Sequence, residues 1–252
     1  MLKNNVVFYL PFLYTFSVNR KGLEGIAYFL EFYLFSFFAF IIFKGNSLLP
    51  IDIIYFILMQ VGFTSLYEIG YIDNNTRSIK KESKPTLRHT KEQIEFAQNN
   101  YFSIYSIRIF LSASMFILIF DSVFSLSIFY SVLTLLTFLL YNNIRQGWLN
   151  RINFVLLRFL RYFSILVFLG WNGFAISLFI SLNNFINNLA WYPERTKFRL
   201  PRFFGTKIFD AVIYLIIGLS YLFVENEYGY LFIYMFVVKF ILFSYKYFFA
   251  IR

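Results

Sequence analysis

Polar and charged side chains gather at residues 67–88, between two very apolar stretches of this 252-residue chain. Carboxylates, amides and a hydroxyl fall within fifteen residues, at Glu68, Asp73, Asn74, Asn75, Ser78 and Glu82. Basic side chains interleave with them or follow them, at Lys80, Lys81, Lys84 and Arg88. Mg²⁺ prefers oxygen ligands, and Lys and Arg neutralise phosphate oxygens. The cluster therefore favours a site for a metal-bridged diphosphate, and the alternative is a solvated basic loop.

The spacing within this cluster adds a geometric expectation. Asn74, Ser78 and Glu82 are four residues apart. A continuous helix would stack them on one face, because residues i and i+4 are neighbours on a helix surface. A solvated loop explains the lysines and Arg88, but it does not explain why acids and amides gather beside an apolar stretch.

A second cluster lies at residues 191–207, where Glu194 is the clearest acid and Arg195 and Arg199 are among several basic residues. Pro193 and Pro201 stiffen this segment. Asp210 follows just inside the next apolar stretch. The alternative to a binding site is a basic loop at the membrane surface.

Further charges lie inside apolar stretches, where they are costly unless they are partnered. Arg151, Arg158 and Arg161 are seven and three residues apart, which places them along one helix face. The partner of Arg161 could be a bound phosphate or a carboxylate from another helix, and the sequence leaves both alternatives open. Glu31 and Lys239 are further charges of this kind and could pair structurally.

The elements that position these residues are predicted to be membrane helices. Hydrophobic residues make up 59% of the chain and charged residues 14%, against about 25% charged in soluble domains. Eight apolar stretches are long enough to span a bilayer, near 24–43, 51–69, 102–120, 123–141, 153–169, 172–190, 208–224 and 229–248. We therefore expect an all-α polytopic bundle of about eight transmembrane helices, forming a single transmembrane domain around a central cavity open to the cytoplasm.

The distribution of basic residues predicts the topology. The longer basic connections, at 70–101, 142–152 and 191–207, fall on one side, which the positive-inside rule makes cytoplasmic together with both termini. Residues 1–23 are expected to form an interfacial segment. This topology predicts an integral protein of the bacterial inner membrane, in contact with membrane lipids, and gives no support for nucleic-acid binding.

The remaining composition restricts the chemistry. The chain has no cysteine, which excludes thiolate metal sites and a cysteine nucleophile. Its single histidine, His89, cannot build a His-rich metal site and is expected to be a solvated loop residue. From Lys91 onward the sequence favours a short helix that leads into the third apolar stretch.

The first cluster resembles the aspartate-rich motif N-D-x-x-D-x-x-x-D of the UbiA superfamily of intramembrane prenyltransferases. Asn74 matches the Asn of that motif, and the aspartate positions are taken, in order, by Asn75, Ser78 and Glu82. Lys84, Pro85 and Arg88 resemble the segment that follows the motif. The second cluster resembles the family's second motif in its place after the sixth apolar stretch, with Glu194 as the matching acid.

The resemblance implies a transferase that acts on a polyprenyl lipid and a diphosphate-bearing small molecule with the help of Mg²⁺. Asn74, Glu82 and Glu194 would be catalytic, and Mg²⁺ would be held by Glu68, Asp73, Asn75, Glu82 and Glu194. Phosphate oxygens would be bound by Lys84, Arg88, Arg158, Arg161, Arg195 and Arg199. Asn75 and Ser78 stand where the family has aspartates. Either the metal is bound more weakly, or Glu68 and Asp73 serve as its ligands instead, or basic side chains replace part of the charge of the metal.

Two transferase reactions remain open. One is transfer of phosphoribose from phosphoribosyl diphosphate to polyprenyl phosphate for glycan precursor synthesis, which we favour because two phosphorylated substrates suit the many basic residues. The other is prenyl transfer from a prenyl diphosphate to an aromatic or polar acceptor. A transporter or flippase for an anionic lipid or metabolite and an inactive scaffold are the alternatives from other classes.

Overall fold

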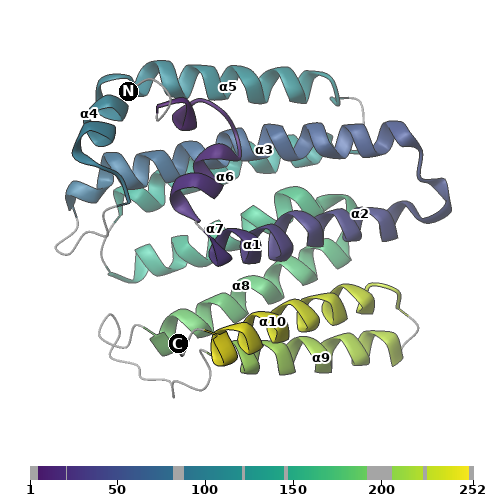
Figure 1. Ribbon diagram of the computed structural model, residues 1–252. Helices are drawn as coiled ribbons and strands as arrows, with labels where there is room; N and C mark the ends of the chain where they lie inside the picture. The colour runs from purple at the N-terminus through teal and green to yellow at the C-terminus, as the bar shows by residue number, and fades with distance from the viewer. Residues whose placement is uncertain are drawn as a thin grey trace. The chain divides into compact units, whose positions relative to one another are not determined.

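The computed structural model describes residues 5–20, 22–81, 88–120, 123–144, 147–191, 206–223 and 226–249. Every regular element in these ranges is helical, which confirms the all-α class (Figure 1). A helix occupies each of the eight apolar stretches identified in the sequence.

Four helical segments of the described ranges are long and apolar enough to cross a membrane: Leu23–Ser47, Pro50–Thr76, Ser125–Asn143 and Leu149–Leu169. Shorter apolar helices are Tyr101–Ile117, Ile208–Phe223 and Gly229–Ser244. These lengths and compositions support a membrane protein, and the count of eight spans stays a prediction.

The chain groups into two compact units, which are described separately below. Unit 1 comprises Met1–Gly25 and Leu49–Phe168, and unit 2 comprises Ile26–Leu48 and Leu169–Arg252. The first boundary falls inside the short helix α1 (Leu23–Tyr28). The single transmembrane domain predicted from the sequence stays a prediction.

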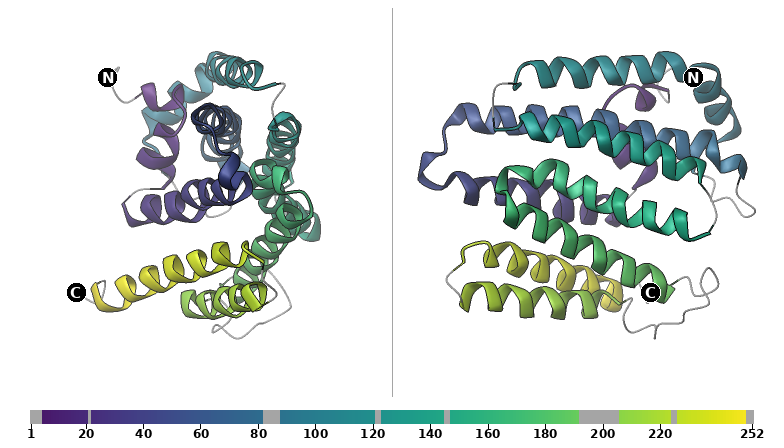
Figure 2. Two further views of the ribbon diagram at one scale, coloured as in Figure 1. Left: turned by 90° about the vertical axis from the view of Figure 1, so that its right-hand side faces the viewer. Right: turned by 180° about the vertical axis from the view of Figure 1, so that it is seen from behind.

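Unit 1 is built on the long helix α3 (Pro50–Thr76), against which α5 (Tyr101–Ile117) and α6 (Ser125–Asn143) pack. Helix α7 (Gly147–Leu166) packs in turn on α6 (Figure 2). Two glycines of α3 permit this close packing. A Cβ at Gly62 would lie 2.5 Å from the Phe116 ring on α5, and one at Gly70 would lie 2.2 Å from the Phe138 ring on α6.

Helix α3 continues beyond the end predicted at residue 69. Pro50 occupies its first turn, where a missing N–H costs nothing, and the Asp52 carboxylate accepts from the Leu49 N–H at 2.9 Å. At the other end the helix runs to Thr76. The polar side chains of its last turns, which suggested a loop in the sequence, form hydrogen bonds with neighbouring helices, as Asp73 does with Asn142 and Tyr105. Ser78 lies in the following 3₁₀ turn, so Asn74 and Ser78 do not share one continuous helix face.

The N-terminal segment, residues 5–20, contains a 3₁₀ turn (Val6–Phe8) and a π-helical turn (Thr15–Asn19). It contributes Phe8, Tyr14 and Val18 to an apolar cluster in the core of unit 1. The other buried members of this cluster come from three helices of unit 1 and are Ile72, Ala97 and Ile104. The segment predicted to be interfacial thus supplies part of the core.

The short helix expected from Lys91 is present as α4 (Lys91–Asn99). The Thr90 hydroxyl accepts from the Gln93 N–H at 3.3 Å, while the Gln93 side chain accepts from the Thr90 N–H at 3.2 Å. This reciprocal capping box fixes the start of the helix, which explains why the local sequence predicted it correctly.

Unit 2 contains a π-helical turn (Phe29–Leu34), α2 (Phe35–Lys44), α8 (Trp171–Trp191), α9 (Lys207–Phe223) and α10 (Gly229–Phe249). Helices α9 and α10 pack closely on each other. Phe179 of α8 contacts the rings of Tyr214 and Phe232, with centroid distances of 5.4 and 5.7 Å. Lys239 and Glu31 form an ion pair at 2.7 Å, which confirms the predicted structural pairing of these two charges.

Candidate functional site

Glu68 and Arg108 form a buried ion pair in unit 1, with Nη1 of Arg108 2.7 Å from Oε2 of Glu68 and both side chains 0% exposed. The other carboxylate oxygen accepts from the Thr15 N–H at 2.7 Å. Arg108 also donates to three backbone carbonyls of the N-terminal segment, those of Val7, Phe8 and Leu10. We call this set the anchor, because it ties the N-terminal segment to α3 and α5.

The anchor engages both carboxylate oxygens of Glu68, one of the predicted metal ligands. Each of its carboxylate oxygens already accepts a hydrogen bond, one from Arg108 and one from Thr15. A metal ion that replaced the Arg108 guanidinium would leave that guanidinium buried without its counter-charge. The metal-binding role of Glu68 stays a prediction, and in the structure its carboxylate ties the N-terminal segment to α3 and α5.

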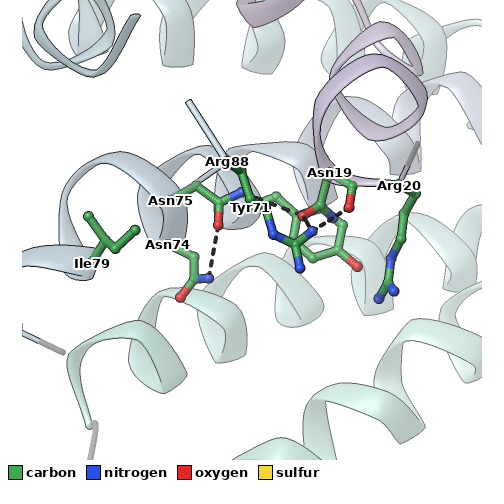
Figure 3. Close-up of a pocket in the computed structure, with 7 residues that line it drawn as sticks. All are labelled: Asn19, Arg20, Tyr71, Asn74, Asn75, Ile79 and Arg88. Atoms are coloured by element: carbon green, nitrogen blue, oxygen red, sulfur yellow. Dashed lines mark hydrogen bonds between the residues drawn. The ribbon is translucent and has the colours of Figure 1, made fainter. Parts of the chain in front are cut away.

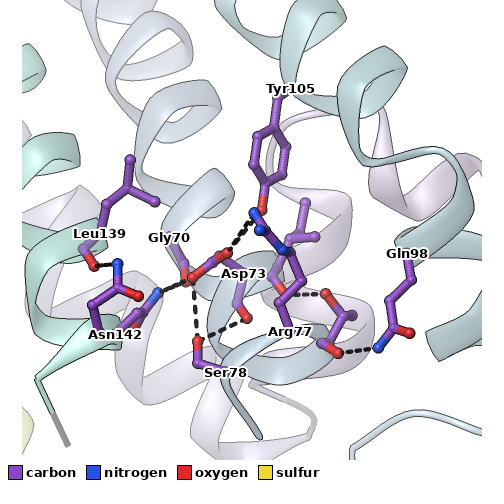
Figure 4. Close-up of polar contacts among 11 residues, drawn as sticks. Gly70, Asp73, Arg77, Ser78, Gln98, Tyr105, Leu139 and Asn142 are labelled. Carbon is purple, nitrogen blue, oxygen red and sulfur yellow. Dashed lines mark hydrogen bonds and ion pairs between the residues drawn. The ribbon is translucent and has the colours of Figure 1, made fainter. Parts of the chain in front are cut away.

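Asp73, one helical turn further along α3, is also fully engaged (Figure 4). Its Oδ2 accepts from Asn142 Nδ2 at 3.0 Å and from the Ser78 hydroxyl at 3.2 Å. Its Oδ1 accepts from the Tyr105 hydroxyl at 3.3 Å and from Arg77 at 3.4 Å. The carboxylate thus joins α3 to α5 and α6 and closes the turn after α3, in place of a predicted metal contact.

His89 belongs to a third polar set. It is only 8% exposed, so the expectation of a solvated loop residue was wrong. Its ring stacks on Phe8 at 5.3 Å, and its Nε2 lies 2.8 Å from the Tyr14 hydroxyl. The same hydroxyl accepts from Asn75 Nδ2 at 3.0 Å. Burial raises the pKa of Tyr14 above its usual range, so its hydroxyl stays protonated in its hydrogen bond with Nε2 of His89.

A pocket of about 210 Å³ opens between the N-terminal segment, the last turns of α3 and residue 88 (Figure 3). Its lining residues are Asn19, Arg20, Tyr71, Asn74, Asn75, Ile79 and Arg88. Arg88 donates to the carbonyl of Asn19 and, at 2.6 Å, to its side-chain oxygen. Asn74 donates to Asn75 at 3.3 Å. Three residues predicted for the site therefore meet here: Asn74, Asn75 and Arg88.

The arginines of α7 lie among aromatic rings. Arg161 is 2% exposed, and its guanidinium lies 5.5 Å from the ring centroid of Tyr67 and 5.3 Å from that of Tyr162. Arg158 lies 5.2 Å from the ring of Phe154. Ring faces attract cations, so these contacts offset part of the cost of burying them. Neither arginine is among the residues that line the pocket.

The structure describes only part of the predicted Mg²⁺ site. No group of three or more acid, histidine or cysteine side chains comes together among them. The described members of the predicted metal set are Glu68 and Asp73, both engaged as above, and the neutral Asn75. Further predicted site residues lie outside the described part of the chain, namely Glu82, Lys84, Glu194, Arg195 and Arg199.

Unit 2 holds a polar cluster of which the sequence indicated only Asp210. Asp210 is 2% exposed, and its Oδ1 accepts from Asn183 at 3.1 Å and Asn187 at 2.9 Å. The two asparagines are four residues apart on α8, a spacing that places them on one helix face. That spacing is the signal that could have identified them.

Sequence reasoning also missed Asn19, Arg20 and Arg108. An arginine in the middle of an apolar helix is costly in a membrane unless it is partnered, so Arg108 alone should have suggested a buried counter-charge. Asn19 and Arg20 carry no such signal, because they reach the pocket only through the folding of the N-terminal segment.

Comparisons with known protein families, curated proteins and solved structures found no match to this chain.

Proposed function

We propose that this chain is an integral membrane transferase that acts on a polyprenyl lipid and a diphosphate-bearing small molecule. The observation that carries the proposal is the pocket beside the last turns of α3, which combines the guanidinium groups of Arg20 and Arg88 with the amides of Asn74 and Asn75. Guanidinium groups match phosphate oxygens in geometry and charge, and amide N–H groups add neutral donors.

The size of the pocket defines which part of a substrate it can hold. Its volume of about 210 Å³ lies below the roughly 300–1,000 Å³ of pockets that enclose a drug-sized molecule. A diphosphate group fits such a space, whereas a polyprenyl chain does not. The lipid would then lie along the apolar helices, with only its phosphorylated end close to the pocket.

The arrangement that fits this activity is an eight-span bundle in the bacterial inner membrane, with both termini and the pocket on the cytoplasmic side. Water-soluble diphosphates are made in the cytoplasm, so a pocket on that side receives its donor directly. The basic connections of the sequence support this orientation.

Of the two transferase reactions, we favour transfer of phosphoribose to a polyprenyl phosphate. An oxygen of the lipid phosphate forms a bond to C1 of the ribose, and the bond from C1 to the diphosphate oxygen breaks. The diphosphate leaves with the electron pair of that bond, and no other reactant is needed. Arg20 and Arg88 would stabilise the negative charge that develops on the leaving group, which is the main way such a site accelerates the reaction.

The test is a product analysis by lipid mass spectrometry. Purified protein incubated with phosphoribosyl diphosphate and polyprenyl phosphate should form a lipid-linked sugar phosphate. Arg88→Gln should lower product formation strongly, whereas Arg77→Gln, which removes the same charge outside the pocket, should not. Product formed only from a prenyl diphosphate and an aromatic acceptor would replace this reaction with prenyl transfer, and no product from any donor would remove the transferase proposal.

A further inference from the structure

We propose that the pocket of unit 1 binds its diphosphate through arginine side chains without Mg²⁺. This inference rests on the proposed function, because it concerns the same pocket and the same group of the substrate. It departs from the Mg²⁺ dependence that the resemblance of the sequence implies, and it follows from the types of side chain that the fold brings together.

The first argument is the set of groups at the pocket. Two guanidinium groups line it, and among the described lining residues there is no carboxylate. Mg²⁺ is usually held by one or two carboxylates together with substrate phosphates and water. Surroundings of this charge repel a divalent cation and attract a multivalent anion.

The described acids of α3 and the N-terminal region already have partners. Glu68 is committed to Arg108 and Thr15 in the anchor, and both oxygens of Asp73 accept hydrogen bonds from neighbouring side chains. Glu24 lies 3.6 Å from Arg20, but it is 69% exposed, and exposed pairs of this kind contribute little. Turning Glu68 or Asp73 toward a metal would break contacts that hold α3, α5 and α6 together.

A further argument is the position of Asn75. Its side chain donates to the Tyr14 hydroxyl at 3.0 Å and to Asn19 Oδ1 at 3.5 Å, and it accepts from Asn74. An aspartate at this position would lack both donated bonds and would add a negative charge beside the phosphate oxygens. The neutral amide therefore suits an anion that is bound directly by arginines.

Arginine can take over the electrostatic part of the role of a metal. The guanidinium group stays protonated at any physiological pH and presents its N–H groups in a planar fork that matches two phosphate oxygens. Two such groups line the pocket, Arg20 from the N-terminal segment and Arg88 from the segment before α4, and each can bind one phosphate of a diphosphate.

The test uses inorganic pyrophosphate as the probe and titration calorimetry of the full-length protein in detergent. Binding should be seen in EDTA, and added Mg²⁺ should not strengthen it. Binding that appears only with Mg²⁺, or becomes more than about tenfold tighter with it, would overturn this inference and leave the proposed function standing. An absence of binding under both conditions would overturn the inference together with the phosphate pocket on which the proposed function rests.

Variants test the same idea from the protein side. In EDTA, Arg88→Gln and, separately, Arg20→Gln should each weaken pyrophosphate binding by about tenfold or more, the usual value of a charge-assisted hydrogen bond. Arg77→Gln should bind as the unchanged protein does. Asn75→Asp should also lose affinity, whereas Asn143→Asp, the same change at an exposed position outside the pocket, should not. Equal affinities for the pocket variants and their controls would contradict the inference.

Discussion

The anchor and the pocket are two polar regions of the same unit, and they differ in whether a buried carboxylate stands against their arginines. In the anchor, the Arg108 cation meets the Glu68 anion at 2.7 Å, and both side chains are 0% exposed. In the pocket, Arg20 and Arg88 bring positive charge to a space of about 210 Å³ that no described carboxylate lines. One region is internally neutral, and the other is suited to receive negative charge from outside.

This difference separates stability from binding. A buried ion pair is costly to assemble but very damaging to break, because removal of one partner leaves the other charge buried and uncompensated. Cations at an accessible pocket remain partly hydrated, so their loss costs little folding free energy. We therefore expect variants of the anchor to unfold unit 1, and variants of the pocket to remain folded and lose their ligand.

The largest effect is expected from Arg108→Met. The change strands the Glu68 carboxylate and three backbone carbonyls of the N-terminal segment, at a cost of about 3–5 kcal/mol in the free energy of unfolding. Thermal unfolding in detergent should show a large fall in the midpoint relative to Arg77→Met, the matched change at a half-exposed position. Equal midpoints for the two variants would mean that the anchor does not stabilise the unit.

Asp73→Ala should destabilise the protein less, by about 1–3 kcal/mol, because it leaves the buried donor of Asn142 without its carboxylate partner. The same unfolding measurement applies. Pyrophosphate binding in EDTA should persist in the variant at temperatures where it is folded. If stability were unchanged and a Mg²⁺-dependent affinity were lost instead, Asp73 would be the metal ligand that the resemblance implies.

Arg88→Gln should change stability by only about 0.5–1.5 kcal/mol, the usual net value of a hydrogen bond, since it loses the contacts to Asn19. The same variant should lose much of its affinity for pyrophosphate. The check is to measure the unfolding midpoint and the pyrophosphate affinity on the same preparation of the variant. A fall in the midpoint as large as that of Arg108→Met would place Arg88 in the structural framework and would remove the contrast between the two regions.

The smallest effect is expected from Arg77→Gln. Arg77 pairs with Asp73 at 3.4 Å and is 52% exposed, and surface pairs of this kind contribute about 0–1 kcal/mol. Neither the unfolding midpoint nor pyrophosphate affinity should move measurably. A clear loss of affinity would show that charge anywhere at this end of α3 suffices, and that the pocket lining is not selective.

Local sequence signals predicted local features well. The stretch from Lys91 onward was predicted to be helical and forms α4, and the two charges inside apolar stretches, Glu31 and Lys239, indicated the pair that the structure contains. The end of α3 was predicted too early, since Asp73 and its neighbours look like loop residues unless their partners on α5 and α6 are known. Residues 82–87 and 192–205 lie outside the described part of the chain, so the predictions for Glu82 and Glu194 stay predictions.

The sequence by itself determined the helical class, the membrane character and the stretch at the end of α3 where polar chemistry is concentrated, because these depend on composition and on periodicity along one chain. Only the tertiary structure decided the roles of individual residues there. Glu68 forms a buried ion pair because folding places Arg108, forty residues away in sequence, against it. Asn19 and Arg20 joined the pocket because the N-terminal segment packs on α3. Charge compensation depends on distances through space, and spacing along the chain does not encode them.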